Sequence, residues 1–416
     1  MAFKSDFLRV LEERDFIHQI SDPDGLDRRL RAGPIAAYIG FDCTADSLHV
    51  GNLVQIMLLH WLQQTGNRPI ALMGSGTTRI GDPSGKEEMR RLLSADEIDA
   101  NKASITRGFS RLVKFGSGAA DAIMQDNADW LLGLNYVDFL GEFGRHFSVN
   151  EMIKRDAVRL RLEREQHLSL LEFNYMVFQA YDFLELHRRH GCVLQMGGSD
   201  QWGNILSGVE LGRRADGAEL FALTTPLITT ASGVKMGKTA EGAVWINEDR
   251  LAPYEYWQFW RNTEDADVGR FLRLFSNLPM AEIARLENLK GAELNDAKIT
   301  LATTATAMLH GEDAARQAAE TARRTFADGA LDLSLPTVTV ARSALAGGMG
   351  LLVATVTSGL AASNGEARRL VAGGALRVND GIVSDDRRVL TEADLLAEGV
   401  IKLSVGKKRH VLLKPV

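Results

Sequence analysis

A segment near the N-terminus combines glycine with polar side chains in a way that suits phosphate binding. In Y-I-G-F-D-C-T-A-D-S-L-H-V-G-N, from Tyr38 to Asn52, a strand pattern ends near glycine and His49 opens a helix. The unpaired N–H groups and the positive dipole end of such a helix attract anions, and Thr44 and His49 could add side-chain donors. An ordinary capped helix is the plain alternative for this segment alone.

Two lysine-containing segments resemble phosphate-binding P-loops but fail their spacing. G-D-P-S-G-K-E at 81–87 and G-V-K-M-G-K-T at 233–239 each have three residues, instead of four, before the Gly-Lys pair. A Walker-type nucleotide hydrolase is therefore disfavoured. Lys235 and Lys238 can still bring ammonium groups onto phosphates as charge develops, because glycines flank them. A solvated basic loop is the alternative.

A strongly apolar helix pattern at 172–186 carries three polar side chains on one face. Tyr175, Gln179 and Asp182 are spaced by four and three residues, so they line up along the helix. Buried polar groups need partners, and a hydroxyl, an amide and a carboxylate could together bind a small polar ligand. An internal hydrogen-bond network would satisfy the same pattern.

A second glycine-rich turn follows at 195–204, with the sequence Q-M-G-G-S-D-Q-W-G-N. Two glycines allow a nucleoside to lie against the backbone, and Asp200 could accept hydrogen bonds from ribose hydroxyls. The glycine spacing of dinucleotide-binding sites is absent. A tight turn capped by Asp200 is the alternative.

The elements that carry these segments predict an α/β fold. Residues 35–42 read as a strand, 48–64 as a helix and 69–74 as a second strand; 192–196, 197–200 and 201–211 repeat strand, turn and helix. Such units form right-handed crossovers in a parallel sheet. We therefore expect a Rossmann-like doubly wound sheet, with ligands beyond the carboxyl ends of its strands.

The rest of the chain predicts further domains. We expect the catalytic domain to cover residues 1–228, with a helical insertion near 123–164 to which the residues assign no role. A mobile lysine loop follows at 229–246, then an all-helical domain at 247–330, a linker at 331–350 and a small αβ module at 351–416.

The composition of the chain limits the classes of function that it can have. No apolar run approaches the roughly 18 to 20 residues of a membrane helix, the N-terminus matches no targeting segment, and Cys43 and Cys192 are the only cysteines. We therefore expect a cytoplasmic protein. The net charge is −6, but from residue 347 onward ten Lys and Arg face seven acids, giving +3 and leaving −9 for the remainder. A basic end on an acidic body suits a local polyanion contact.

Taken in this order, the segments resemble the class I aminoacyl-tRNA synthetases, and in particular the bacterial-type tyrosyl enzymes. The first segment is similar to the family's HIGH signature and K-M-G-K-T to its KMSKS loop. G-D-P-S-G-K and Y-M-V-F-Q-A-Y-D-F are similar to its amino-acid pocket, and G-G-S-D-Q-W-G-N to its ribose site. The segment S-N-G-E-A-R-R-L-V-A-G-G-A-L-R-V-N-D-G-I-V at 363–383 resembles a small RNA-binding fold named from a ribosomal protein.

The resemblance implies an activity and its partners. The enzyme would activate L-tyrosine with ATP and magnesium to tyrosyl-adenylate, then transfer tyrosine to the 3′ end of tRNA(Tyr). No protein-bound metal or prosthetic group is expected. The helical domain would bind the anticodon, and the family's assembly implies a homodimer.

The resemblance also implies residue roles. The tyrosine pocket would consist of Tyr38 and Asp182 at the phenol, Asp82, Tyr175 and Gln179 at the ammonium group, and Gln201 at the carboxylate. ATP would contact Asp42, Asn52, Gly198, Asp200 and Lys238. The leaving pyrophosphate would be stabilised by Thr44, His49, Lys235, Lys238 and Thr239. Further phosphate contacts would come from Lys86 and Arg90, and RNA contacts from Arg368 and Arg369.

The sequence departs from the family pattern at several positions. Asn52 replaces the second histidine of the HIGH signature, the loop reads K-M-G-K-T, Cys43 stands where many relatives have proline, and Arg79 is atypical. An asparagine amide can still donate to a phosphate or ribose oxygen, so we expect activity to survive.

Three other functions compete with this prediction. A tryptophan-activating synthetase shares the fold, but an indole offers one donor and cannot use the pairing of Tyr38 with Asp182. A catalytically inactive, synthetase-derived RNA-binding protein would explain Asn52. The third alternative is a generic α/β nucleotide-binding protein.

Overall fold

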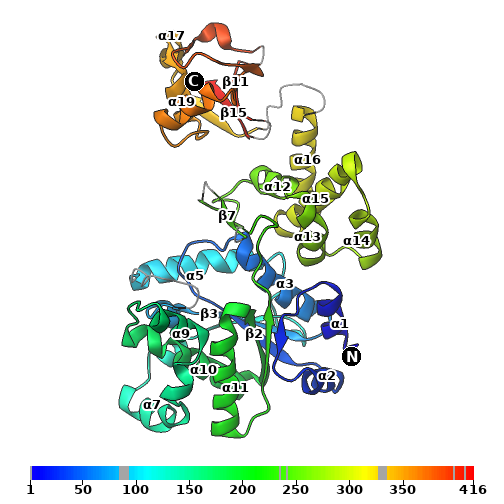
Figure 1. The fold of residues 1–416 in the computed structure, drawn as a ribbon, viewed down its shortest axis with the longest axis vertical. Helices are drawn as coiled ribbons and strands as arrows, with labels where there is room; N and C mark the ends of the chain where they lie inside the picture. The colour runs from blue at the N-terminus through cyan, green and yellow to red at the C-terminus, as the bar shows by residue number, and fades with distance from the viewer. Residues whose placement is uncertain are drawn as a thin grey trace. The chain divides into compact units, whose positions relative to one another are not determined.

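The computed structural model describes residues 2–83, 93–233, 236–239, 242–326, 335–396, 399–406 and 409–416. The chain divides into two compact units, Met1–Glu312 and Asp313–Val416 (Figure 1). Lys86, Arg90 and Lys235 lie outside the described residues.

A six-stranded sheet forms the centre of the first unit. Its strands are β1 (Gln19–Ile20), β2 (Ala36–Phe41), β3 (Arg68–Met73), β4 (Ile123–Asp126), β5 (Cys192–Gly198) and β6 (Phe221–Thr225). Their order is β1-β6-β5-β2-β3-β4, and all neighbours are parallel except β1 and β6. The chain runs outward from β2 to β3 and β4, then returns to β5 on the other side. The sheet is therefore doubly wound, as expected, with its switch point between β2 and β5.

The helices predicted at 48–64, 172–186 and 201–211 are present as α3, α10 and α11, and the structure adds α1, α2, α4 and α5. The helices of the sheet domain are α1 (Asp6–Glu13), α2 (Pro23–Arg31), α3 (Val50–Gln64), α4 (Ser75–Thr78), α5 (Ala95–Phe109), α10 (Leu170–His190) and α11 (Trp202–Asp216). The 3₁₀ turn η2 (Ser199–Gln201) joins β5 to α11. Apolar residues recur along α3 at helical spacing and are buried against the sheet, which explains why this segment folds as a helix there.

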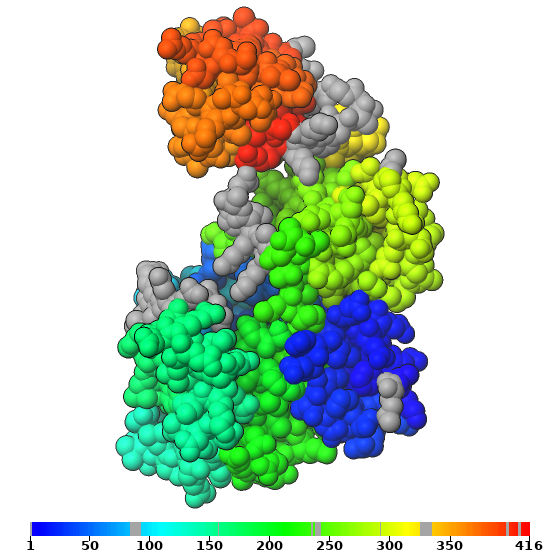
Figure 2. Space-filling view, viewed as in Figure 1, coloured from blue at the N-terminus to red at the C-terminus, as the bar shows by residue number. Residues whose placement is uncertain are grey.

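The insertion differs from the prediction at its start. Residues 123–126 form the edge strand β4, paired with β3, and only the following residues are helical. Four residues are too few to show a strand period, so the pattern of the following helices dominated the prediction. The insertion helices are α6 (Ala128–Leu131), α7 (Tyr136–Glu142), η1 (Gly144–His146), α8 (Val149–Met152) and α9 (Asp156–Glu163). They cover one side of the unit in Figure 2.

The rest of the first unit is mostly helical. A short hairpin of β7 (Lys238–Thr239) and β8 (Gly242–Ala243) precedes α12 (Pro253–Arg261), η3 (Asp265–Asp267), α13 (Val268–Phe275), α14 (Met280–Glu287), η4 (Gly291–Glu293) and α15 (Leu294–His310). Trp260 lies at the centre of this helical part. Its ring packs against those of Phe271 and Phe275, which belong to α13.

The second unit contains a small αβ fold. Its helices are α16 (Glu312–Phe326), which begins at the unit boundary, α17 (Arg342–Ala346), α18 (Leu351–Thr357), α19 (Asn364–Ala372) and η5 (Glu392–Asp394). Its strands are β9 (Thr337–Val340), β10 (Met349–Gly350), β11 (Leu376–Val378), β12 (Gly381–Ile382), β13 (Val389–Leu390), β14 (Ile401–Val405) and β15 (Arg409–Pro415). Five strands form one sheet in the order β12-β11-β14-β15-β9. Among the described helices of the whole chain, none combines the length and apolarity needed to cross a bilayer.

Candidate active site

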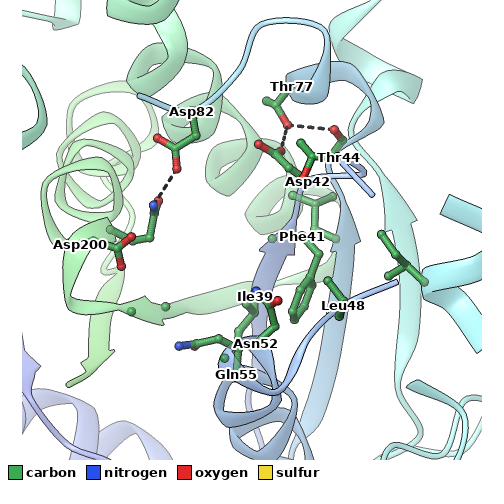
Figure 3. A pocket seen from close by; sticks show the side chains of 18 of the residues that line it. Ile39, Phe41, Asp42, Thr44, Leu48, Asn52, Gln55, Thr77, Asp82 and Asp200 are labelled. Atoms are coloured by element: carbon green, nitrogen blue, oxygen red, sulfur yellow. Dashed lines mark hydrogen bonds between the residues drawn. The ribbon is translucent and has the colours of Figure 1, made fainter. Parts of the chain in front are cut away.

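One cavity of about 810 Å³ lies at the switch point of the sheet. It opens where β2 and β5 end and where α3 begins, the position at which doubly wound sheets bind ligands. Figure 3 shows residues from these elements facing one another around it. The cavity is lined by most of the expected site residues: Tyr38, Asp42, Thr44, His49, Asn52, Asp82, Tyr175, Gln179, Asp182, Gly198, Asp200 and Gln201.

The hydroxyl of Tyr38 and the carboxylate of Asp182 line the cavity, and both residues are almost completely buried. Trp130 Nε1 donates to Asp182 Oδ1 at 2.7 Å, and Asn127 Nδ2 donates to Oδ2 at 2.9 Å. The Tyr38 hydroxyl has no hydrogen-bond partner among the described residues. Because a buried hydroxyl without a partner is costly, this end of the cavity suits a ligand that offers a hydroxyl group.

Burial sets the protonation of this pair. It raises the pKa of Asp182 to about 7, although the hydrogen bonds from Asn127 and Trp130 oppose the change. Burial, together with the nearby charge of Asp182, raises the pKa of Tyr38 well above its usual value. Tyr38 therefore keeps its proton, whereas Asp182 changes charge near neutral pH.

This titration predicts a pH-dependent affinity for a phenol. Only ionised Asp182 is a full acceptor, since both its oxygens already receive donors. The affinity for a ligand with a phenol group, such as free tyrosine, should therefore fall by up to about tenfold per unit as pH drops below about 7. Equilibrium dialysis without ATP from about pH 5.5 to about pH 7.5 measures it. The affinity for phenylalanine, which lacks the hydroxyl, is measured in the same way as the control and should change little. A tyrosine affinity that is flat over this range would contradict the assignment.

A second polar cluster lies at the side of the cavity formed by α10 and α11. Gln201 Nε2 donates to Asp82 Oδ2 at 2.7 Å (Figure 3), and Asn204 Nδ2 donates to Gln179 Oε1 at 3.0 Å. Asn204 also lies 3.3 Å from Gln201 Oε1. The amides are thus held by one another, and the Asp82 carboxylate can accept from a cation such as an ammonium group.

Asp42, which directly follows β2, accepts hydrogen bonds from two hydroxyl groups. Thr77 Oγ1 donates to its Oδ1 at 2.8 Å (Figure 3), and the Tyr175 hydroxyl donates to its Oδ2 at 3.1 Å. Burial, followed by the charge of Asp42, raises the pKa of Tyr175 well above its usual value. Tyr175, which the resemblance assigned to an ammonium group, therefore contacts the residue assigned to ATP.

The N-terminus of α3 faces the cavity with a reciprocal cap. The Gly51 N–H donates to His49 Nδ1 at 3.0 Å, and the His49 N–H donates to Asn52 Oδ1 at 3.2 Å. Because Nδ1 accepts, the neutral imidazole carries its proton on Nε2 and can donate it to an anion. Asn52, which replaces the second histidine of the HIGH signature, completes the cap with its Oδ1. Its Nδ2 is therefore the group able to donate to a ligand.

A side chain on either glycine at the end of β5 would displace its neighbours. A Cβ atom on Gly198 would lie 2.6 Å from Asp200 Oδ1, and one on Gly197 would lie 3.2 Å from Ile205 Cδ1. Asp200 therefore lies directly beside the glycine backbone. A ribose resting on these glycines would have its hydroxyls near a carboxylate acceptor.

The predicted lysine loop at 229–246 is called the lysine segment from here on, and its Gly237 packs against the start of α3. Gly237 has φ +86°, and a Cβ atom there would lie 2.8 Å from both Gly51 N and His49 Nδ1. Gly237 stands where the KMSKS pattern has serine. At this position the backbone is left-handed and the space for a side chain is occupied by His49 and Gly51. For Lys238 and Thr239 the structure describes the backbone of β7 but not the side chains.

The two residues expected to contact RNA lie in the second unit. Arg368 and Arg369 are exposed on α19. Arg368 Nε lies 2.7 Å from Asp386 Oδ2, so this guanidinium already has an acidic neighbour.

Sequence reasoning missed the residues that hold Asp182. Asn127 directly follows β4 and Trp130 lies on α6, and Asn127 also donates to Thr77 Oγ1 at 3.0 Å. A polar residue at the carboxyl end of a strand was the available signal. It was lost because β4 was read as part of the helical insertion.

Comparison with known proteins agrees with this geometry. The family described as "tRNA synthetases class I (W and Y)" matches residues 30–327. A tyrosine–tRNA ligase of Bradyrhizobium diazoefficiens is 63% identical over 414 residues, covering 100% of this chain and 99% of the relative. One of Rhodospirillum rubrum is 64% identical over 413 residues, covering 99% of each.

Solved structures show the same relationship. The C-terminally truncated mitochondrial tyrosyl-tRNA synthetase of Aspergillus nidulans is 30% identical with a TM-score of 0.70, covering 78% of this chain and 95% of that one. A tryptophanyl-tRNA synthetase of Encephalitozoon cuniculi, 11% identical with a TM-score of 0.55 and matching 77% and 92% of the two chains, shares the fold. The chain therefore belongs to the class I aminoacyl-tRNA synthetases, within the tyrosyl-tRNA synthetase family.

Proposed function

We propose that this chain is a working tyrosine–tRNA ligase whose cavity binds L-tyrosine and ATP side by side. The observation that carries the proposal is the buried pair Tyr38 and Asp182, with both oxygens of Asp182 held by Trp130 and Asn127. A phenol can donate to the carboxylate and accept from Tyr38. An indole cannot do both, which disfavours tryptophan.

The reaction needs no nucleophile from the protein. A carboxylate oxygen of tyrosine attacks the α-phosphorus of ATP, and the bond to the bridging oxygen of pyrophosphate breaks, giving tyrosyl-adenylate. A ribose hydroxyl of the terminal adenosine of tRNA then attacks the adenylate carbonyl, and AMP leaves. The protein contributes positioning and stabilisation of developing charge. Magnesium would arrive with ATP as part of the substrate.

The family resemblance supplies the remaining roles, and the places of the described side chains around the cavity support those that lie there. We assign the tyrosine ammonium group to Asp82 with Tyr175 and Gln179, and the tyrosine carboxylate to Gln201. We assign the ribose of ATP to Gly198 and Asp200, and we propose Asp42 and Asn52 as further contacts of ATP. For the leaving pyrophosphate we propose Thr44, His49, Lys235, Lys238 and Thr239.

We assign tRNA contacts to the exposed arginines Arg368 and Arg369 of α19. Their charge suits phosphate, and exposure leaves them accessible within the second unit. We also propose that the helical part at 247–330 binds the anticodon and that the enzyme acts in the cytoplasm. A catalytically inactive RNA-binding protein is disfavoured because every residue proposed for the tyrosine pocket lines the cavity and His49 caps α3.

Charging of tRNA tests this proposal. Purified chain, ATP, magnesium and radiolabelled tyrosine should esterify a tRNA(Tyr) transcript but not a tRNA(Trp) transcript. Acid-precipitable counts with tRNA(Tyr) alone are the expected result. No counts from a folded chain, or equal counts with both transcripts, would overturn it.

We also propose that the chain is a homodimer through its helical insertion. Large apolar side chains are exposed there, on α6 to α8 and beside them: Leu132, Tyr136, Val137, Leu140, Val149 and Ile153. In Figure 2 the insertion lies on the outer face of its unit. Several large apolar side chains exposed on neighbouring helices are typical of a protein interface.

A charge at this patch should separate the subunits. Val137 is 75% exposed, so Val137→Glu should fold normally yet sediment as a single chain of 45.6 kDa, whereas the unchanged chain sediments at twice that mass. Ile299→Glu is the matched control, because Ile299 is 40% exposed on α15 and away from the insertion. Analytical ultracentrifugation measures both. An unchanged chain that is monomeric, or a Val137→Glu variant that stays dimeric, would contradict the assignment.

A further inference from the structure

The segment just before K-M-G-K-T is bound to the start of α13. Asp267 is buried, and its Oδ2 accepts the Ala231 N–H at 2.7 Å. Its Oδ1 accepts Arg270 Nη2 at 2.9 Å. One carboxylate thus joins the backbone of the lysine segment to a side chain of the helical part.

Two further contacts strengthen this connection. Arg270 Nη2 also donates to the carbonyl oxygen of Thr229. Ser232 Oγ donates to Glu264 Oε1 at 2.6 Å. Residues 229, 231 and 232 are therefore held by one short stretch, 264–270, which is separated from them by more than thirty positions in the sequence.

Capping of its own helix does not explain Asp267. It occupies the N-cap position of α13, where an aspartate normally accepts N–H groups from the first turn, yet it makes no side-chain cap bond. Its carboxylate instead bonds to the lysine segment and to Arg270. A buried carboxylate must have such partners, so this arrangement depends on the lysine segment being in place.

The other end of the same segment is bound to the catalytic centre. Met236 N donates to the Ile228 carbonyl at 2.8 Å, which closes the base of the loop, and both residues line the cavity. Beyond it, Gly237 packs on His49 and Gly51, as described above. The residues before Lys235 are thus fixed to the helical part and those after it to the N-terminus of α3.

We propose that Asp267 and Arg270 are positioning residues that fix the approach of the lysine segment to the phosphates of ATP. The inference rests on the proposed function, in which Lys235 and Lys238 stabilise the leaving pyrophosphate. Neither positioning residue lines the cavity. Their effect is therefore on the rate of adenylate formation and not on the binding of tyrosine, because small misplacements of a charge-stabilising group cost rate steeply.

Single-turnover formation of tyrosyl-adenylate tests this in the full chain. Asp267→Ala should lower the rate by roughly 10- to 100-fold while the Kd for tyrosine stays within about twofold. Asp267→Asn, which keeps an acceptor for the Ala231 N–H, should fall between Ala and the unchanged chain. Asp265→Asn is the matched control, since Asp265 lies in the same turn and pairs only with Lys298 among the described residues.

Arg270→Met provides a second variant with the same expected pattern if Asp267→Ala fails to fold. Rates of the Asp267 and Arg270 variants equal to that of Asp265→Asn would overturn the inference. So would a parallel loss of tyrosine affinity, which indicates general disruption. Failure of the proposed function is distinguishable, because the unchanged chain would then form no adenylate at all.

Discussion

Asp182→Ala is expected to lower kcat/KM for tyrosine by about 10³-fold or more. The variant loses the acceptor of the substrate hydroxyl and leaves the buried donors of Trp130 and Asn127 without their partner. Burying the substrate hydroxyl without its charged acceptor costs up to about 4 kcal/mol, and about 1.4 kcal/mol corresponds to a factor of ten, so the loss reaches about a thousandfold. The unpaired donors of Trp130 and Asn127 are present in the free enzyme too, so they lower mainly its stability.

Phenylalanine separates this effect from general damage. It carries no hydroxyl, so its slow activation should change far less than that of tyrosine, and the preference for tyrosine should collapse. Glu185→Gln is the matched control: Glu185 follows Asp182 on α10, is also nearly buried, and pairs with Arg189 outside the cavity. Steady-state pyrophosphate exchange with tyrosine and with phenylalanine measures the unchanged chain and both variants. Retained tyrosine preference in Asp182→Ala would show that the phenol binds elsewhere.

His49→Ala should reduce the rate of adenylate formation by roughly 10²- to 10³-fold without weakening tyrosine binding. The variant loses the Nε2 donor that we propose stabilises the developing phosphate charge. It also loses the cap on Gly51, which is expected to lower the free energy of unfolding by about 1 kcal/mol.

Asparagine at this position separates the two losses. His49→Asn supplies a good N-cap acceptor, so thermal unfolding should return towards that of the unchanged chain. The rate should stay low unless the shorter amide reaches the phosphate. Single-turnover kinetics and thermal denaturation measure the two effects. If His49→Ala keeps the full rate, the imidazole has no role in phosphate transfer.

The sheet and most of the cavity could be predicted from the sequence because both depend on local patterns. Strand, glycine turn and helix recur around 35–64 and 192–211, and parallel strands bring their carboxyl ends to one edge. The polar residues in those turns had to face a common space. Their roles as ligand contacts remain proposals that the experiments above address.

Other parts of the site could not be predicted from short stretches of sequence. Trp130 follows a four-residue strand, and its contact with Asp182 crosses 52 positions of sequence. The bond from Ala231 to Asp267 spans 36 positions and replaces an expected helix cap. Such contacts depend on tertiary packing, which no short pattern encodes.

ATP–pyrophosphate exchange with each of the twenty standard amino acids in turn, with magnesium and without tRNA, tests the central claim most directly. Exchange that depends on tyrosine alone is the predicted result, because only a phenol satisfies both Tyr38 and Asp182. Exchange with tryptophan would contradict the pocket assignment, and no exchange with any amino acid from folded chain would contradict the activity itself.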